Sequence, residues 1–162
     1  MNVATANLAG ITGITRRLVL DGALSEAVAR KALDEATKAK KQAQAYLLEQ
    51  RLVTSAQVAA ANSVEFGMPL FDPSSMDMRF SAAKSVNEEL IQKNSALPLF
   101  KRGNRLYVAI SDPTNTRALD EIKFAANMTV EPILVDEERL RRATAMAPAS
   151  SASMDTGTGD DA

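Results

Sequence analysis

The side chains that most often carry out chemistry in proteins are sparse in this sequence. Its 162 residues include no Cys and no His, which excludes thiol nucleophiles, disulfides, Ser-His-Asp triads and metal sites built from His or Cys. Adjacent carboxylates occur at Glu88-Glu89 and at Asp120-Glu121, but neighbouring residues of a helix point in different directions and do not form a facing acid–base pair. We therefore expect no catalytic residues and no metal site in this chain.

Motifs for phosphate and calcium are also missing from the sequence. None of the seven glycines stands in the Gly-x-x-x-x-Gly-Lys-Ser/Thr pattern whose backbone cradles nucleotide phosphates. The segment Asp112-Pro113-Thr114-Asn115 lacks the ligand spacing of an EF-hand calcium loop and is better explained as a turn that caps a helix. The chemistry left open is binding rather than catalysis.

Charge and hydropathy narrow the range of partners. The sequence has 19 basic and 20 acidic residues, a net charge of -1, whereas a dedicated nucleic-acid-binding protein is usually basic. No apolar run approaches the ~20 residues that span a bilayer, and residues 1–10 lack the basic and apolar regions of a secretory signal. We expect a cytoplasmic protein with no nucleic-acid partner and no direct membrane insertion.

The elements that would position a binding surface begin with a helical subdomain over residues 11–64, which are rich in Ala, Leu, Lys and Gln. Within it, residues 18–25 align with residues 47–54, an offset of 29 residues. Each copy holds an apolar helix end, a short turn and a hydroxyl residue that can cap the next helix. This degenerate repeat predicts two helix–turn–helix units, or about four helices. Simple helical packing and a ligand-binding repeat both fit the pattern.

The following residues, 65–146, predict a small α/β subdomain with a three-stranded mixed sheet. Gly103-Asn104 is typical of a hairpin turn, and Pro98 indicates that the strand containing it lies at a sheet edge or at a strand start. A hairpin followed by a βαβ unit accounts for the pattern, so the fold class is α+β. The expected elements are a helix over 86–94, strands over 97–101 and 106–110, a helix over 116–126, a strand over 129–135 and a last helix from Asp136 to about Met146.

Two terminal segments complete the predicted organisation. Residues 1–10 are expected to be a flexible N-terminus. Residues 147–162 contain mainly Ala, Ser, Thr, Gly and Asp, a composition that does not bury apolar surface. We expect them to be a disordered linker toward a further domain.

Three stretches resemble the N-terminal domain of type IV pilus assembly ATPases of the PilB type, which is related to the MshEN-like N-terminal domains of type II secretion ATPases of the GspE type. They are residues 65–72, 96–115 and 118–124, with the runs Pro-Leu-Phe-Lys-Arg-Gly-Asn and Ser-Asp-Pro-Thr-Asn as the most specific parts. The resemblance covers about residues 14–145.

The resemblance implies a non-catalytic regulatory and docking domain of a hexameric motor used in bacterial motility. The ATP and Mg²⁺ site of such a motor lies in a later domain. Implied partners are a PilZ-type adaptor, the protein's own ATPase domain, its hexamer neighbours and pilus platform proteins of the inner membrane. The implied location is the cytoplasmic face of that membrane.

The resemblance also raises cyclic di-GMP, which some family members bind through two copies of Arg-Leu-Gly-x-x-Leu-Val-x-x-Gly. The first repeat here keeps Leu18, Val19 and Gly22 but lacks the leading Arg and the first Gly, and the second repeat, residues 42–51, lacks the Arg and both glycines. Close approach of a backbone to a ligand needs such glycines. We therefore expect weak or no binding of cyclic di-GMP, with a cyclic di-GMP sensor as the alternative function.

A docking surface is then expected where the repeat has lost its nucleotide motif and retains apolar and basic side chains. The residues predicted to form it are Arg16, Arg17, Leu20, Tyr46 and Leu47.

Overall fold

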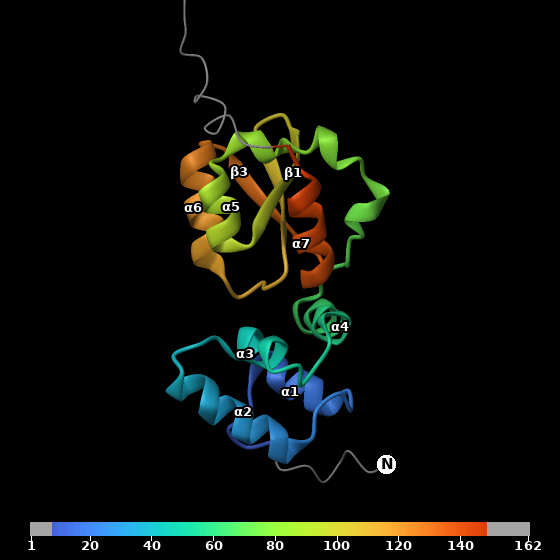
Figure 1. Cartoon of the computed structure of the whole chain (residues 1–162), viewed down its shortest axis with the longest axis vertical. Coiled ribbons are helices and arrows are strands. Elements are labelled where there is room, and N and C mark those ends of the chain that lie inside the picture. The colour runs from blue at the N-terminus through green and yellow to red at the C-terminus, as the bar shows by residue number, and fades with distance from the viewer. Residues whose placement is uncertain (1–7, 149–162) are drawn as a thin grey trace, which may run out of the picture. The chain divides into compact units, whose positions relative to one another are not determined.

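The computed structural model describes residues 8–148, and the α+β fold predicted from the sequence is confirmed (Figure 1). The chain divides into two compact units between Met68 and Pro69, whereas the sequence placed the division between residues 64 and 65. The predicted terminal segments, 1–10 and 147–162, lie largely outside the described residues.

The first unit, called here the helical unit, contains four α-helices, as predicted. Its core is formed by apolar side chains of all four helices and their connections, and the two Leu residues at matching positions of the repeat, Leu18 and Leu47, are each only 1% exposed. The helices are α1 (Gly13–Leu20), α2 (Glu26–Lys38), α3 (Ala43–Glu49) and α4 (Ser55–Phe66).

The backbone confirms that the helical unit is a repeat. At the end of α1 the Ala23 N–H donates to the Leu18 carbonyl over 2.9 Å, and at the end of α3 the Leu52 N–H donates to the Leu47 carbonyl over 3.0 Å. Gly22 and its counterpart Arg51 are both left-handed, with φ of 78° and 55°. This is the hydrogen-bonding pattern of a Schellman helix end, repeated at the same offset as the sequence repeat.

The helix starts repeat in the same way. The Ser25 hydroxyl accepts a hydrogen bond from the Val28 N–H before α2, and Thr54 forms a complete capping box with Gln57 before α4. Such side chains satisfy N–H groups that have no partner within the helix. The repeat therefore fixes both the ends of α1 and α3 and the starts of α2 and α4.

The second unit, called here the α/β unit, is built on a three-stranded sheet in the order β1-β2-β3. Strand β1 (Ala96–Arg102) pairs antiparallel with β2 (Arg105–Ile110), and β3 (Thr129–Leu134) pairs parallel with β2 after the crossover helix α6 (Thr116–Ala126). The predicted hairpin and βαβ unit are confirmed. Pro98 lies in the edge strand β1, as its missing N–H requires.

Helices and short 3-10 turns surround the sheet. They are η2 (Pro73–Ser75), η3 (Met78–Phe80), η4 (Ala82–Ser85), α5 (Glu88–Asn94) and α7 (Glu137–Met146). The three 3-10 turns were not predicted from the sequence. Each begins with a side-chain cap, from Asp72, Asp77 and Ser81 respectively, and the Ser81 hydroxyl also donates to the Pro98 carbonyl. That bond covers part of the free edge of β1, where an unpaired carbonyl would otherwise invite another strand.

The core of the α/β unit contains more buried apolar side chains than that of the helical unit, and fewer buried polar ones. Eight of its apolar side chains are completely buried at 0% exposure: Leu97, Leu99, Leu106, Val108, Ala109, Ile122, Leu134 and Val135. Because β2 buries side chains on both faces, it takes the central place that its apolar sequence predicted.

Candidate docking surface on the helical repeat

Helix α1 presents Arg16 and Leu20 on one face, because residues four apart lie one above the other on a helix. Arg16 is exposed and Leu20 is partly exposed. Within residues 8–148 no carboxylate forms an ion pair with Arg16. A cation and an aliphatic side chain are therefore available together on α1.

Arg17 has a different role from its neighbour. Its guanidinium forms ion pairs with Asp21 over 3.6 Å and with Glu65 over 3.5 Å, and its side chain is 29% exposed. The second pair joins α1 to the end of α4. Partly exposed pairs of this kind contribute little energy each, but they hold Arg17 along its own unit rather than outward.

Tyr46 is half-buried, and its hydroxyl donates a hydrogen bond to the carboxylate of Glu35. This hydrogen bond is the main reason why the pKa of Tyr46 is raised above its ordinary value, with burial as the next cause. Because Glu35 lies in α2 and Tyr46 in α3, the bond fastens two helices of the repeat together. Tyr46 can present only the outer part of its ring to a partner.

Leu47 does not belong to a docking surface, and this part of the prediction is wrong. The side chain is 1% exposed because Leu47 occupies the position in the second copy that Leu18 occupies in the first, where both fill the core. The structure therefore brings Arg16 and Leu20 together on α1, assigns Arg17 and Tyr46 mainly to contacts within the unit, and removes Leu47 from the surface.

The retained residues of the nucleotide motif are structural. Leu18 and Val19 are buried at 1% and 8% exposure, and Gly22 supplies the left-handed turn with no atom within 4 Å of where a Cβ would stand. Their presence is explained by the core and the turn.

The positions of the missing first glycines are filled by buried polar side chains. Thr15 stands there in the first copy at 1% exposure, and its hydroxyl has no hydrogen-bond partner among the described residues. Gln44 stands there in the second copy at 6% exposure and accepts a hydrogen bond from the Asn62 amide over 3.0 Å. A backbone that carries these inward side chains has lost the open approach that glycine gives.

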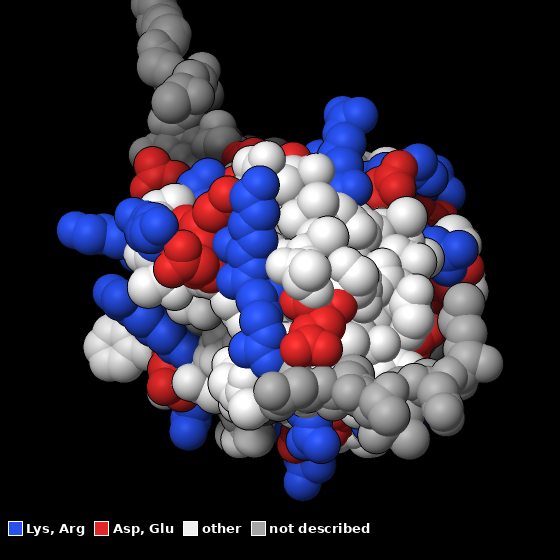
Figure 2. Space-filling view, turned by 90° about the horizontal axis from the view of Figure 1, so that it is seen from below, with Lys and Arg blue, Asp and Glu red and all other residues white. Residues whose placement is uncertain are grey.

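The charges on α2 are largely paired with each other. Glu26 pairs with Arg30, Lys31 with Glu35 and Asp34 with Lys38, each pair four residues apart. In the face of the helical unit turned to the viewer in Figure 2, basic and acidic side chains alternate beside an area without charge. Such a surface is typical of a solvated helix and offers no single-sign field for a charged partner.

A feature that sequence reasoning missed is an apolar stripe around α4. Leu52 is 37% exposed and Val64 is 64% exposed, and Ala56 and Ala60, which lie between them at the same four-residue spacing, are also exposed. That spacing is visible in the sequence and marks one side of a helix. The α4 stripe, residues 52, 56, 60 and 64, is a second apolar surface on the helical unit.

Among residues 8–148, no three His, Cys, Asp or Glu side chains are grouped so that they could hold a metal ion. The helices in the same part of the chain are all too short or too polar to cross a membrane.

The MshEN domain model matches residues 66–154. The type IV pilus assembly ATPase PilB of Acinetobacter baylyi is 38% identical over 131 residues, which are 81% of this chain and 23% of the relative. PilB of Pseudomonas aeruginosa is 32% identical over 130 residues, or 80% and 23% of the two chains. This chain thus spans less than a quarter of the length of these curated relatives.

Two solved structures share the fold at low sequence identity. A structure of MshE with cdg has a TM-score of 0.66 and 20% identity, covering 83% of this chain and 97% of that one. A structure of the N-terminal domain of XpsE has a TM-score of 0.71 and 16% identity, covering 83% and 92%. At these identities the likeness concerns the fold.

Proposed function

Because this chain belongs to the MshEN domain family, we propose that it is a non-catalytic regulatory and docking domain of a type IV pilus assembly ATPase of the PilB type. The curated relatives that support this carry that name, and the chain covers only 23% of each. In this proposal, ATP and Mg²⁺ belong to a separate ATPase domain. The chain passes the state of a bound partner to that domain and to its neighbours in the hexamer.

One observation carries the proposal: the repeat keeps its architecture but not its ligand positions. Its cores and turns match between copies, while Thr15 and Gln44 fill the places of the close-approach glycines and Arg51 replaces the second turn glycine. A fold retained without its small-molecule motif favours a protein ligand. The proposed partner is a PilZ-type adaptor, with pilus platform proteins of the inner membrane as the neighbouring machinery at its cytoplasmic face.

Arg16 and Leu20 are the proposed contact residues. Arg16 is the exposed cation of α1 without an ion pair in the described part of the chain, and Leu20 supplies apolar surface one turn away. Arginine with neighbouring apolar surface is a combination that often dominates the energy of protein interfaces. The exposed α4 stripe extends the apolar area of the same unit.

The test is isothermal titration calorimetry of the purified chain with the PilZ-type adaptor of the same organism. Arg16→Glu is expected to weaken binding roughly tenfold, because it replaces an attractive interface cation by a repelling charge. Lys31→Glu is the matched control, since it makes the same change of charge on the ion-paired surface of α2. Equal affinity of all three proteins would place the docking surface elsewhere, and no binding by the unchanged chain would remove the adaptor from the proposal.

A cyclic di-GMP sensor is the second candidate, and it is favoured by the fold shared with MshE, which has been solved with cdg. The buried Thr15 and Gln44 argue against such a site here. Calorimetry with cyclic di-GMP is expected to give no heat of binding at micromolar concentrations, and micromolar binding would replace the docking proposal by the sensor.

A further inference from the structure

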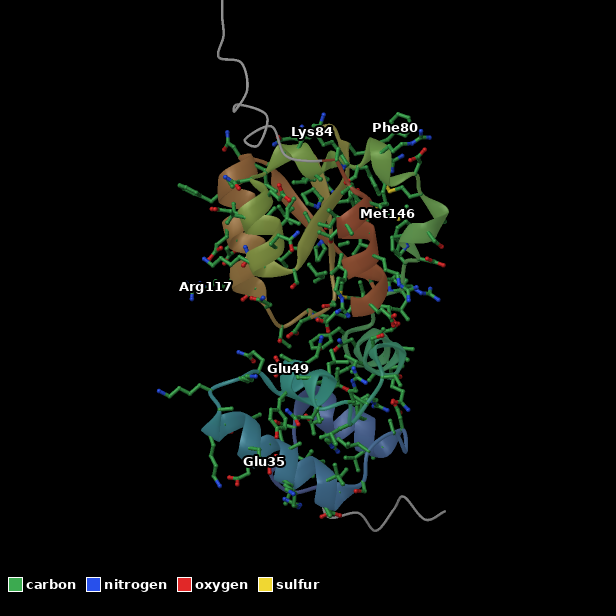
Figure 3. The ribbon with its side chains drawn as sticks, viewed as in Figure 1. Glu35, Glu49, Phe80, Lys84, Arg117 and Met146 are labelled. Atoms are coloured by element: carbon green, nitrogen blue, oxygen red, sulfur yellow. The ribbon has the colours of Figure 1, made fainter. Side chains whose placement is uncertain are left out.

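The α/β unit carries a shallow hollow that the docking proposal does not use. It has a volume of about 480 Å³, and residues of η3, η4 and β1 line it: Phe80, Ala82, Lys84, Ser85, Phe100 and Lys101. We call it the Phe80–Lys101 hollow. In Figure 3, Phe80 and Lys84 lie at the same end of the α/β unit. Two phenyl rings and two amines thus face one small space.

The hollow lies along the free edge of the sheet. In the described part of the chain, β1 has a neighbouring strand on one side only. Successive side chains of a strand point to opposite faces, so a space lined by both Phe100 and Lys101 follows the edge of β1 rather than one of its faces. The Ser81 hydroxyl covers this edge at the Pro98 carbonyl, and the hollow begins beyond that point.

The register of the hairpin directs main-chain groups to the same edge. The hairpin closes at the pair Arg102 and Arg105 across the two-residue turn, and the next pair is Lys101 with Leu106. Pairs in an antiparallel ladder alternate between residues that exchange hydrogen bonds and residues whose N–H and C=O point away from the partner strand. Because the closing pair is of the first kind, the N–H and C=O of Lys101 point to the free edge. They offer a donor and an acceptor to an extended chain.

The aromatic part of the hollow is supported on one side and open on the other. Phe100 is half-buried and stacks on Tyr107 of the neighbouring strand, with ring centroids 4.6 Å apart. Phe80 is 78% exposed. A phenyl ring buries substantial apolar area when it is covered, so the hollow favours an occupant with a bulky apolar side chain.

The charge at the hollow has a single sign. Within residues 8–148, Lys84 and Lys101 form no ion pair, and no carboxylate lines the hollow. A second hollow of the α/β unit, with a volume of about 680 Å³, differs in this respect, because Asp120 lines it beside Lys123 and Phe124. Charge complementarity therefore predicts an anionic occupant for the Phe80–Lys101 hollow.

We propose that the Phe80–Lys101 hollow docks an extended acidic segment of another protein, in which carboxylates flank a bulky apolar side chain. The carboxylates pair with Lys84 and Lys101, and the apolar side chain covers the two phenyl rings. The main-chain groups of Lys101 favour a polypeptide over a nucleic acid or a lipid headgroup, because an extended polypeptide supplies a donor and an acceptor in strand register. This contact belongs to the α/β unit and goes beyond the adaptor docking of the helical unit, so either can fail without the other.

An NMR titration of the full chain with the peptide acetyl-Glu-Asp-Phe-Asp-Glu-amide tests the proposal. The peptide is expected to bind with a Kd of about 1 mM and to shift the amide signals of Lys84, Ser85 and Lys101 most. Binding is expected to weaken at about 1 M salt, where the screening length falls to about 3 Å. The same peptide with Ser in place of Phe is expected to bind roughly fivefold more weakly. Equal affinity for both peptides, or largest shifts elsewhere, would overturn the proposal.

Charge variants test the role of the two amines. The double change Lys84→Glu with Lys101→Glu is expected to weaken binding of the Phe peptide at least roughly tenfold, because two attractive charges become repelling ones. Both side chains are exposed, so the change leaves the core intact. Lys123→Glu with Arg141→Glu is the matched control, since it alters two exposed cations elsewhere on the same unit. Similar affinity of the two double variants would contradict recognition by charge at this hollow.

A ring variant and two other anionic probes identify the occupant. Phe80→Ala is expected to weaken binding of the Phe peptide roughly fivefold, whereas Phe124→Ala, which removes a ring that is 90% exposed on α6, is expected to leave it unchanged. Equal effects of the two changes would contradict the apolar contact. If oligothymidylate or phosphatidylglycerol vesicles shifted the same amide signals at lower concentration than the peptide, the hollow would belong to a nucleic acid or a lipid surface, and the proposal would be wrong.

Discussion

The helical unit and the α/β unit use their charged side chains in different ways. On the helical unit, most of the described cations are paired with carboxylates of the same unit, as in the Arg17–Glu65 and Lys41–Glu49 pairs, and Arg16 is an exception. On the α/β unit, Lys84 and Lys101 line one hollow together with Phe80 and Phe100, and neither lysine forms an ion pair within the described part of the chain. The α/β unit also has ion pairs, such as Arg117 with Glu121 and Arg142 with Glu138, so the difference is that two of its unpaired lysines share one hollow with two phenyl rings.

The cores of the two units differ as well. Much of the helical unit's core consists of small side chains, such as Ala29 and Ala61, and it also encloses the polar residues Thr15, Gln44 and Asn62. The α/β unit encloses eight apolar side chains at 0% exposure, in and around its sheet. Because burial of apolar area supplies most of the folding energy, the α/β unit depends on its core, and the helical unit depends relatively more on caps, turns and ion pairs.

The largest expected effect is therefore a core truncation in the α/β unit. Leu106→Ala removes a completely buried side chain of the central strand and is expected to lower the free energy of unfolding by about 3 kcal/mol. Hydrogen exchange followed by mass spectrometry is expected to show the loss of protection in residues 69–148. Leu18→Ala is the matched truncation in the helical unit. Equal loss of protection across both units in either variant would show that they unfold as one, and would break the comparison.

A smaller effect is expected at the two left-handed turns of the repeat. Gly22→Ala introduces a Cβ at φ 78° and is expected to destabilise the helical unit by about 1 kcal/mol, because L-residues disfavour this region. Arg51→Gly relieves the same strain at φ 55°, and is expected to stabilise the unit by no more than about 1 kcal/mol, since glycine also gains freedom in the unfolded chain. Denaturant unfolding followed by circular dichroism measures both.

The opposite signs of these two changes are the informative part. If Arg51→Gly destabilised the unit as much as Gly22→Ala, the arginine side chain itself would hold the second turn, and the two copies would not be equivalent. Arg51→Ala is the control, because it removes the side chain but keeps the left-handed strain.

Most of the fold was predictable because local signals agreed with the global pattern. Gly103-Asn104 between apolar runs predicted the hairpin, and the offset of 29 residues predicted the repeat that the backbone confirms. The 3-10 turns of residues 73–85 were missed because they have no hydrophobic period. Their geometry depends on single capping side chains such as Asp77 and on contacts with β1, which lie far apart in the sequence.

The candidate surface was predictable only in part. Arg16 and Leu20 were found, but Leu47 was misassigned because a repeat does not by itself show which of its matched positions face inward. Apolar character alone does not show which side chains of α6 face inward either. Phe124 is 90% exposed, whereas Ile122 is buried. The reason is that residues two apart lie on opposite sides of a helix. Free cations around a hollow cannot be read from sequence, since pairing is decided by tertiary contacts.

The smallest expected effects concern pH, because the pKa shifts of the carboxyl groups in the α/β unit and those of the shifted groups in the helical unit have opposite directions. The lowered carboxyl pKa values all belong to the α/β unit: hydrogen bonds from Ser74 lower the pKa of Asp72, those from Arg79 lower the pKa of Asp77, and that from Asn94 lowers the pKa of Glu121. In the helical unit the shifts are upward. The hydrogen bond to Glu35 raises the pKa of Tyr46, and that to Asp34 raises the pKa of Lys38.

These directions predict which unit loosens first at each end of the pH scale. A carboxylate with a lowered pKa stabilises the fold above its ordinary value, 3.8 for Asp72, and the gain is lost as pH falls through the folded pKa. A group with a raised pKa stabilises the fold below its ordinary value, 10.0 for Tyr46, and the gain is lost as pH rises through the folded pKa. Acid is therefore expected to weaken the α/β unit first, and alkali the helical unit.

Methyl NMR measures this difference, with Ile122 reporting on the α/β unit and Ile14 on the helical unit. Asp72→Asn is expected to remove part of the acid sensitivity of the Ile122 signal and to leave the alkaline behaviour of Ile14 unchanged. Tyr46→Phe is expected to do the reverse, because it removes the hydroxyl that titrates against Glu35. Signals of both units that change together at both ends of the scale would mean that net charge, rather than these local hydrogen bonds, controls the response. The contrast between a unit held partly by paired charges and a unit held by its core would then not extend to pH.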